Sequence, residues 1–563
     1  MGDFLAGAGL FAAVLAVSAA MLTEPSPRRS AAMLVALALI PILIFSDQWK
    51  STEIVALRDH AARFVVLALL AVVIVIALTL LFRRHRTLLP LAIIAAIPFR
   101  IPLHAGGQEA NLLFPLYLVI AGGVLASAWA LLERGRDAAS TGGAAPSTGG
   151  AEAAIADRAQ SPSTAASADS VTGPVAERSG PAAERMVPLA LAAILILYAI
   201  QSVYSEDFSR ALQNVAFFYV PFALAFVLLS DCRWDRRLLI GALGVVAAEA
   251  ALFAIFGFWE YGARHLIWNS EVIQSNDFHT YFRVNSLFWD PNVYGRFLAL
   301  TIVALVAVVL WLRNPRQLVW LAVLVGILWL GLMTTFSQSS YAALLVGLAT
   351  LAALRWSLRW TLGACAAGAL ATAIFVIAAG GSLKINLSTE QTLNKDTAGR
   401  ANLVSEGAKL FGDRPLWGYG SGSFSAAYVK HRSGGNSQLT VSHTEPITVA
   451  AEQGLPGLIA YLAVLAAAFI TLLSGMRGLM PGLGASPVTG PSPERPIARA
   501  AVLACFVALM AHTLAYAGFL EDPLTWVLLA VGASLAAATR LEREEAGARG
   551  DRQTARQPAA TTT

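Results

Sequence analysis

The sequence has few charged residues and very few cysteines. Asp, Glu, Lys and Arg make up only 13% of the 563 residues, whereas 57% are hydrophobic, and a typical soluble domain has about 25% charged residues. This balance excludes a soluble enzyme or a nucleic-acid reader, and the net charge of +5 is modest. The three cysteines, Cys232, Cys365 and Cys505, lie in or beside apolar segments without close pairing. Neither a disulfide framework nor a metal cluster is therefore expected.

Apolar runs dominate the rest of the chain, and each is long enough to cross a bilayer. The first run, Phe4 to Leu22, has no basic region before it, so we interpret it as a retained span rather than a cleaved signal peptide. The predicted fold is an all-α, polytopic transmembrane bundle of about 12–15 spans. The candidate spans are 4–22, 31–46, 64–82, 87–103, 111–132, 187–203, 211–230, 238–258, 297–312, 318–336, 341–354, 361–380, 448–474, 499–517 and 523–538.

One Ala/Ser/Thr/Gly/Pro-rich stretch, 137–185, divides the chain. It has no aromatic residue and cannot bury a core, so we expect a disordered cytoplasmic linker. The linker separates a transmembrane block at 1–136 from a larger transmembrane domain at 186–540. A disordered cytoplasmic tail is expected at 541–563.

Arginine clusters predict the orientation of the spans, because basic loops stay in the cytoplasm. The clusters are Arg83-Arg84-His85-Arg86, Arg233 with Arg236-Arg237, Arg313 with Arg316, and Arg355 with Arg359. Placing all of them inside brings three polar segments together outside: 260–296, 337–340 and the long loop 381–447. Any chemistry is therefore expected on the outer face of the membrane.

The first of these polar segments ends in Asp290-Pro291-Asn292, directly before a span. Asp290 as N-cap and Pro291 at the first helical position start a helix, which is a sufficient structural explanation. The functional alternative is that an outward-facing helix N-terminus attracts anions. Arg283 and Arg296 flank it and can bind phosphate oxygens with two N–H groups each.

The second segment, 337–340, belongs to the polar stretch 334–341, which interrupts an apolar run that is too long for one span. A turn between two antiparallel spans accounts for it. However, its hydroxyl groups and the amide of Gln338, which follows Ser337, are also suited to lining a polar cavity at the membrane edge.

The long loop 381–447 contains two further signals. Residues 399–412 have apolar side chains at helical spacing, at Ala401, Val404, Ala408 and Phe411, which predicts an amphipathic helix with Arg400 at its start. Residues 415–424 have three glycines at alternate positions, and such glycines let the backbone approach a ligand closely.

His443 stands at the outer mouth of a span, followed by Glu445 and, one helical stretch later, by Glu452, Gly454 and Gly457. An interfacial histidine in contact with water explains this placement. Imidazole also titrates near neutral pH, so His443 is a candidate general base or phosphate ligand. Glu445 and Glu452 are alternative bases.

The order of these motifs over residues 185–540 resembles the O-antigen ligase and polymerase superfamily. It consists of Arg-Val-x-x-x-Phe-x-x-Pro-Asn before a span, Thr-x-Ser-x-Ser in the next hairpin, and Gly-Arg, Pro-Leu-x-Gly-x-Gly-x-Gly-x-Phe and His-x(10)-Gly-x-x-Gly in and after the outer loop.

The resemblance implies a fold similar to the metal-independent lipid-carrier glycosyltransferases, and the chain has no Asp-x-Asp motif. It also implies transfer of a glycan from an undecaprenyl-diphosphate carrier to a glycan or lipid-glycan acceptor, outside the cytoplasmic membrane and without a cofactor. Membrane lipids are the other expected partners. Ligase and polymerase share this donor, and the sequence does not distinguish them.

By the same resemblance, the site divides into three groups of residues. Those expected to act in catalysis are His443 and Glu445. Those expected to bind the diphosphate are Arg400, Arg283 and Arg296. Those expected to line the cavity are Pro291, Asn292, Ser337, Gln338, Gly454 and Gly457.

Two positions depart from the family pattern. The family usually has Ser-Arg where this chain has Ser337-Gln338, which removes one expected diphosphate-binding cation. His443 is followed by Thr444 rather than by Asn, Ser or Gln.

The alternative function is a transporter or flippase of lipid-linked saccharides. A transporter needs ionisable groups near the bilayer midplane, and the candidates are Glu249 and His512. The concentration of polar residues on one face favours the enzyme.

Overall fold

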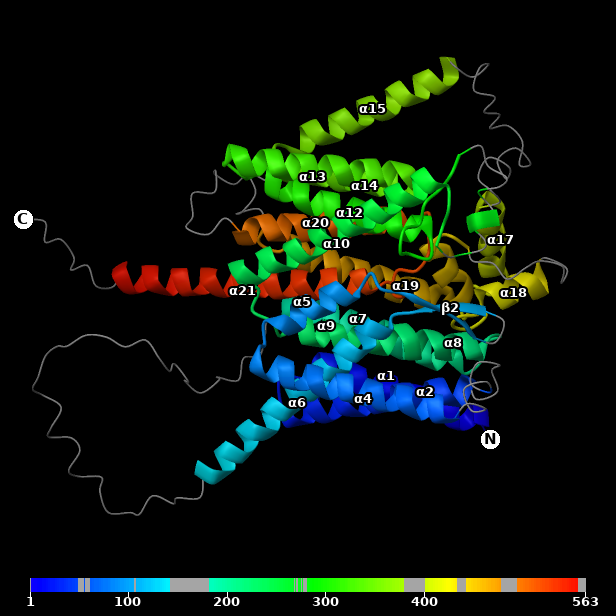
Figure 1. Cartoon of the computed structure of the whole chain (residues 1–563), viewed down its shortest axis with the longest axis vertical. Coiled ribbons are helices and arrows are strands. Elements are labelled where there is room, and N and C mark those ends of the chain that lie inside the picture. The colour runs from blue at the N-terminus through cyan, green and yellow to red at the C-terminus, as the bar shows by residue number, and fades with distance from the viewer. Residues whose placement is uncertain are drawn as a thin grey trace, which may run out of the picture.

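The structure is a computed structural model, and it describes residues 2–48, 55, 61–105, 108–141, 182–267, 269, 272–274, 276, 281–378, 400–432, 442–476 and 494–554. Long helices running in alternating directions are stacked into one bundle (Figure 1). Twelve helical segments of the described chain are long and apolar enough to cross a membrane. The predicted helical, polytopic membrane fold is therefore confirmed, at the lower end of the expected count.

In its described residues, the N-terminal block contains five helices and one short hairpin. Its elements are α1 (Gly2–Leu22), α2 (Pro27–Gln48), α4 (Ala61–Arg84), α5 (Leu88–Ala96), β1 (Ile101–Ala105), β2 (Gln108–Leu112) and α6 (Phe114–Thr141). Helix α1 packs against α2 and α7, and α4 packs against α6.

The predicted span at 87–103 is wrong. Helix α5 ends at Ala96, since Pro98 has no N–H group with which to extend a helix. The chain then becomes extended and forms an antiparallel hairpin in which Ile101 pairs with Leu112. Arg100 lies between the short helix and the hairpin. A segment that looked like a lipid-facing helix therefore delivers a cation into the bundle.

The C-terminal block contains the remaining helices. They are α7 (Ala182–Ser202), α8 (Phe208–Asn214), the π-helical turn η1 (Val215–Tyr219), α9 (Val220–Ser230), α10 (Arg236–Ala263), α12 (Pro291–Val309), α13 (Pro315–Thr334), α14 (Gln338–Arg355), α15 (Leu358–Ala378), α17 (Arg400–Asp413), α18 (Phe424–His431), α19 (Glu445–Leu473), α20 (Glu494–Thr513) and α21 (Pro523–Thr554).

Small residues hold α12, α14 and α20 together in this block. A Cβ on Gly295 would lie 2.7 Å from Ser340 Oγ, and one on Gly347 would lie 2.6 Å from Val303 Cγ2. Such close approach between helices is typical of membrane proteins, where packing replaces the hydrophobic effect. It brings the start of α12 directly against the start of α14.

The two ends of the bundle differ in character (Figure 1). Helices α17 and α18, the hairpin strand β2 and helix α8 lie at one end, which we call the α17 end. The starts of α12, α14 and α19 lie there too. The opposite end holds the last turn of α4, which carries Arg83 and Arg84, and the start of α10. Ion pairs join the chain there, between Arg29 and Asp231 at 3.1 Å and between Arg236 and Glu494 at 2.8 Å.

The expected linker and tail are shorter in the described chain than predicted. Helix α6 continues to Thr141, and α7 begins at Ala182. Residues 541–554, expected to be disordered, are helical because α21 continues through good helix formers and an Arg540–Glu544 pair at 2.8 Å. Residues 142–181 and 555–563 lie outside the described residues.

Candidate active site

Two of the predicted polar motifs meet at the α17 end. Asp290 caps α12 by accepting a 2.5 Å hydrogen bond from the Asn292 N–H, and Pro291 follows at the first helical position. The Asn292 side-chain oxygen accepts hydrogen bonds from Ser337 Oγ at 2.8 Å and from Arg283 Nη2 at 3.2 Å. The start of α12 and the turn before α14 are therefore one buried polar unit.

Arg283 fastens this unit from the loop before α12. Its Nε donates to the Thr335 carbonyl at 3.0 Å, in addition to the bond to Asn292. Arg283 is half-buried, and both contacts are to protein groups. In this arrangement it organises the walls of the site.

The turn before α14 presents its serines inward and Gln338 outward. Ser337, Ser339 and Ser340 are buried, whereas Gln338 is exposed. Ser339 Oγ lies 3.2 Å from Nε2 of His512, which is fully buried on α20. The hydroxyl groups thus connect α12, α14 and α20.

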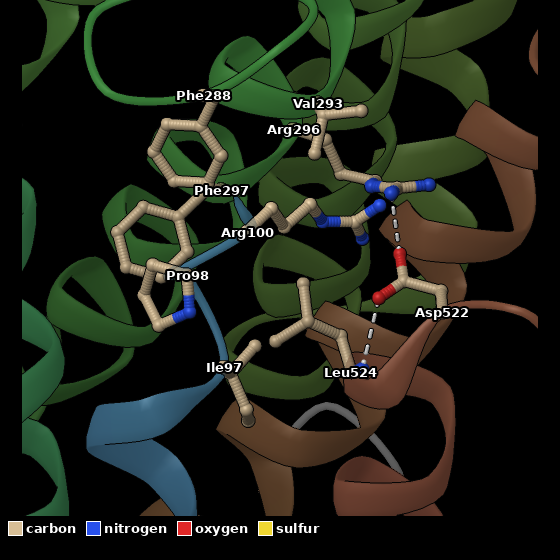
Figure 2. Close-up of a pocket in the computed structure, with 9 residues that line it drawn as sticks. All are labelled: Ile97, Pro98, Arg100, Phe288, Val293, Arg296, Phe297, Asp522 and Leu524. Atoms are coloured by element: carbon tan, nitrogen blue, oxygen red, sulfur yellow. Dashed lines mark hydrogen bonds and ion pairs between the residues drawn. The ribbon is translucent and has the colours of Figure 1, made fainter. Parts of the chain in front are cut away.

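Arg296 lies one turn into α12 and is paired in the interior. Its Nη2 lies 2.6 Å from the carboxylate of Asp522, and both side chains are almost completely buried. Asp522 also accepts the Leu524 N–H at 2.9 Å at the start of α21. Arg100 reaches the same place from the N-terminal block, so two guanidinium groups face one carboxylate (Figure 2).

Electrostatics at this cluster follow from its burial. Burial lowers the pKa of Arg100; the charge of Asp522 opposes this and that of Arg296 adds to it. Burial, followed by the negative charge of Asp290, raises the pKa of Tyr516. Arginine remains charged in proteins. The cluster therefore holds two positive charges next to a neutral phenol.

Tyr516 links this cluster to both histidines. Arg296 lies over its ring at 6.0 Å from the centroid. The His512 ring centroid is 5.6 Å away and that of His443 is 6.4 Å away. The Tyr516 ring therefore lies next to both His443 and Arg296, although the three residues come from different segments.

The backbone of His443 is strained, with φ of +60°, a region that non-glycine residues rarely occupy. Ser442 holds it in place, because its hydroxyl accepts the Thr444 N–H at 3.1 Å and also hydrogen bonds Thr448. Strained backbone that its surroundings maintain is typical of functional sites.

Glu445 and Glu452 both bind backbone N–H groups. Glu445 Oε2 accepts those of Gly518 at 2.7 Å and Phe519 at 3.2 Å, in the loop that carries Tyr516. Glu452 accepts those of Gly422 at 2.8 Å and Phe424 at 3.0 Å. These geometries favour positioning roles for both carboxylates.

The glycines of 415–424 serve packing between protein segments. A Cβ on Gly418 would lie 2.3 Å from the Glu452 carbonyl oxygen, and one on Gly420 would lie 2.3 Å from Ser205 Cα. The described contacts of these two glycines are with α19 and with the α7–α8 connection, and the approach to a ligand stays a prediction.

The two glycines predicted to line the cavity both lie in α19. Gly454 has φ of +64° and kinks α19, where a Cβ would lie 2.7 Å from the Leu416 carbonyl. Gly457 faces the Gln453 side chain. The described contacts of both glycines are therefore with protein groups.

The predicted amphipathic helix is confirmed as α17, which packs against α18 and α19. Its buried residues include Gly407 and Leu410, whereas Ala408, expected on the apolar face, is exposed. Arg400 is its first residue, and the Arg400 side chain lies outside the described residues.

Sequence reasoning missed Arg100, Tyr516 and Asp522 and gave His512 another role. Arg100 was hidden in an apparent apolar span, although an arginine between two prolines was a signal that the span was interrupted. Nothing local indicated that Asp522 pairs with Arg296. In the part of the chain that the structure describes, no three His, Cys, Asp or Glu side chains are arranged to hold a metal ion.

Comparison with known families bears on the region around α14 and α19. Residues 323–462 match the model of a family described as O-antigen ligase. No curated protein matches the chain. The matched range contains Ser337, Gln338, Arg400, Glu445 and His443, whereas Arg100, Arg296 and Asp522 lie outside it.

Proposed function

We propose that the protein is a membrane glycosyltransferase that takes a glycan from an undecaprenyl-diphosphate carrier and joins it to a surface-polymer acceptor. The main support for this proposal is the match of residues 323–462 to the O-antigen ligase family model. The family acts on lipid-linked glycans in general. A second support is that His443, Arg296 and the serine turn meet at one end of the bundle.

The reaction requires two kinds of group, and the site contains both. The acceptor oxygen loses its proton as it forms a bond to the anomeric carbon, while the bond from that carbon to the diphosphate oxygen breaks. His443 accepts the proton as general base. Arginine side chains offset the negative charge that develops on the departing diphosphate. Arg296 and Arg400 are assigned to this second task, and Arg283 holds the walls of the site.

The remaining predicted residues position these groups. Glu445 holds the loop of Tyr516, and Glu452 holds the glycine turn on α19. Asn292 and Ser337 keep the starts of α12 and α14 together. In this assignment the rigid helices carry the site, and short hydrogen bonds fix its shape.

We propose that the α17 end faces outside the cytoplasmic membrane. The arginine-rich turns lie at the opposite end of the bundle, and basic loops stay in the cytoplasm. The donor is then used where surface polymers are assembled.

The glycan profile of a strain that lacks this chain tests the function. Surviving single repeat units would indicate a polymerase, and long unattached chains on the lipid carrier would indicate a ligase. An unchanged profile of every surface polymer would contradict the proposal. Expression of His443→Ala in the same strain is the matched control, because it keeps the protein in the membrane.

A further inference from the structure

Arg100, which is half-buried, and Arg296, which is buried, form a pair of cations that shares one carboxylate. Asp522 lies 2.6 Å from Arg296, and its charge favours the charged form of Arg100 as well. Arg296 in turn opposes the charge of Arg100. Buried charges are costly unless they are paired. One carboxylate faces two guanidinium groups, so these three side chains carry one net positive charge, and the next carboxylate, Asp290, acts on Tyr516.

Arg296 also has a buried polar atom without a hydrogen-bond partner among the described residues. The side chain is 3% exposed, and this atom is its Nε. A buried donor without an acceptor has a free-energy cost. An anion in the adjacent cavity would remove this cost and balance the extra charge.

The cavity beside the two arginines is small and has two chemical faces. Its polar face is formed by the three charged side chains, and its apolar face includes Ile97, Phe288 and Leu524 (Figure 2). The cavity volume is about 10 Å³, which is room for roughly one water molecule. An anion therefore reaches the guanidinium groups through a single oxygen and is not enclosed whole.

We propose that Arg100 and Arg296 together bind a phosphoryl oxygen of a polyprenyl diphosphate. Cations next to an apolar wall suit an amphiphilic anion better than a small water-soluble anion such as inorganic pyrophosphate. Arg100 is then a substrate-binding residue supplied by the N-terminal block, which lies outside the residues that match the family model. The inference rests on the proposed function for the identity of the lipid.

This assignment also accounts for the position of Gln338. The family usually places a cation there, whereas here the position carries an exposed amide. Arg100 enters the bundle from the interrupted span after α5, close to Arg296 (Figure 2). A cation from another element thus compensates for the one that is missing.

The test measures binding without transfer, on the purified full-length protein in detergent micelles. The probes are undecaprenyl diphosphate, undecaprenyl monophosphate and inorganic pyrophosphate. Arg100→Gln should weaken binding of undecaprenyl diphosphate by about 10- to 100-fold, since a hydrogen bond to a charged group is lost. Arg359→Gln is the matched control, because Arg359 is exposed and close to the end of α14 away from the site, and it should bind like the wild type.

A purely structural role for Arg100 predicts different data. Arg100→Gln would then lower the melting temperature while the folded protein kept wild-type affinity, which would overturn the inference. Arg100→Lys keeps the charge opposite Asp522 and should fold even where Arg100→Gln does not. We expect about 3- to 10-fold weaker binding from it, because lysine lacks the planar two-pronged donor. Unchanged affinity in Arg100→Lys and Arg100→Gln would likewise overturn the inference.

The probes separate this inference from the proposed function. If the wild type bound none of the lipid probes, both would fail. If it bound undecaprenyl diphosphate and the Arg100 variants did so equally well, the function would stand and only the role of Arg100 would fall. Equal affinity for inorganic pyrophosphate would show a general anion site and would contradict the assignment to a lipid diphosphate.

Discussion

At the scale of single residues, the account depends on which arginines meet the donor. A diphosphate brings about two negative charges that must be desolvated and paired. Arg296 is held in the interior by Asp522, and Arg283 is bonded to the walls of the site. Arg400 begins α17 at the same end of the bundle.

Replacement of Arg400 should therefore impair use of the donor. Losing a charged contact of this kind typically costs about 2–5 kcal/mol, which corresponds to roughly 30-fold to several-thousand-fold in rate. Arg400→Ala should show this loss in transfer from a lipid-diphosphate glycan, and Arg400→Lys should recover it only partly. Wild-type efficiency in Arg400→Ala would mean that this arginine is a surface anchor. Gln338→Arg, on an exposed position, should be tolerated.

Glu445 offers a second prediction at this scale. Its Oε2 accepts two backbone N–H groups from the loop that holds Tyr516. Glu445→Gln keeps an acceptor oxygen and should retain most of the activity, whereas Glu445→Ala should lose about 1–3 kcal/mol of stability from two unsatisfied donors. Thermal unfolding and turnover of both variants check this. If Glu445→Gln were as inactive as Glu445→Ala, the carboxylate would act in the chemistry itself.

At the scale of elements, the contact between the glycine turn and α19 decides the shape of the site. The turn donates Tyr419 N–H to the Ala451 carbonyl at 3.1 Å and Gly420 N–H to that of Glu452 at 2.8 Å. The kink at Gly454 opens α19 so that Leu455 N–H can reach the Pro415 carbonyl at 2.7 Å. The two segments thus complete each other's backbone hydrogen bonding.

Gly418→Ala should break this contact. Its φ is +65°, and the added Cβ would collide with the Glu452 carbonyl. We expect a loss of about 2–4 kcal/mol, as for other substitutions that force strain at a left-handed position. Gly412→Ala is the control, because nothing lies within 4 Å of its Cβ position in α17. Equal melting temperatures for the two variants in detergent would show that the turn is not packed as described.

The sequence predicted elements better than their contacts. Apolar length identified most spans, and helical spacing identified α17. Short-range signals also placed the N-cap Asp290. The pairing of Asp522 with Arg296 involves residues far apart in the chain, so no local pattern indicates it. The role of the glycines near a ligand stays a prediction, because close approach to protein and close approach to a ligand require the same residue.

At the scale of the whole molecule, the bundle is polarised from one end to the other. The α17 end holds the polar junction, and the opposite end holds ion pairs such as Arg29–Asp231. Glu249 lies near the middle of the span formed by α10, whereas the polar junction lies at the α17 end. The arrangement therefore favours a one-sided reaction over passage through the bundle.

Cysteine labelling checks the orientation that this polarity implies. In a variant without Cys232, Cys365 and Cys505, Lys430→Cys on α18 should react with an impermeant thiol reagent in intact cells. Arg316→Cys, at the start of α13, should react only after permeabilisation, since both positions are exposed but lie at opposite ends. The reverse pattern would place the site in the cytoplasm.

The most direct test of the central claim is transfer by the purified protein in liposomes. The donor is an undecaprenyl-diphosphate-linked glycan from the same cells, and the measurement is release of undecaprenyl diphosphate together with growth or attachment of the glycan. The account predicts that the wild type releases the carrier and that His443→Ala, folded and inserted to the same extent, does not. Release at the wild-type rate by His443→Ala would contradict the assigned base, and no release by the wild type would contradict the function.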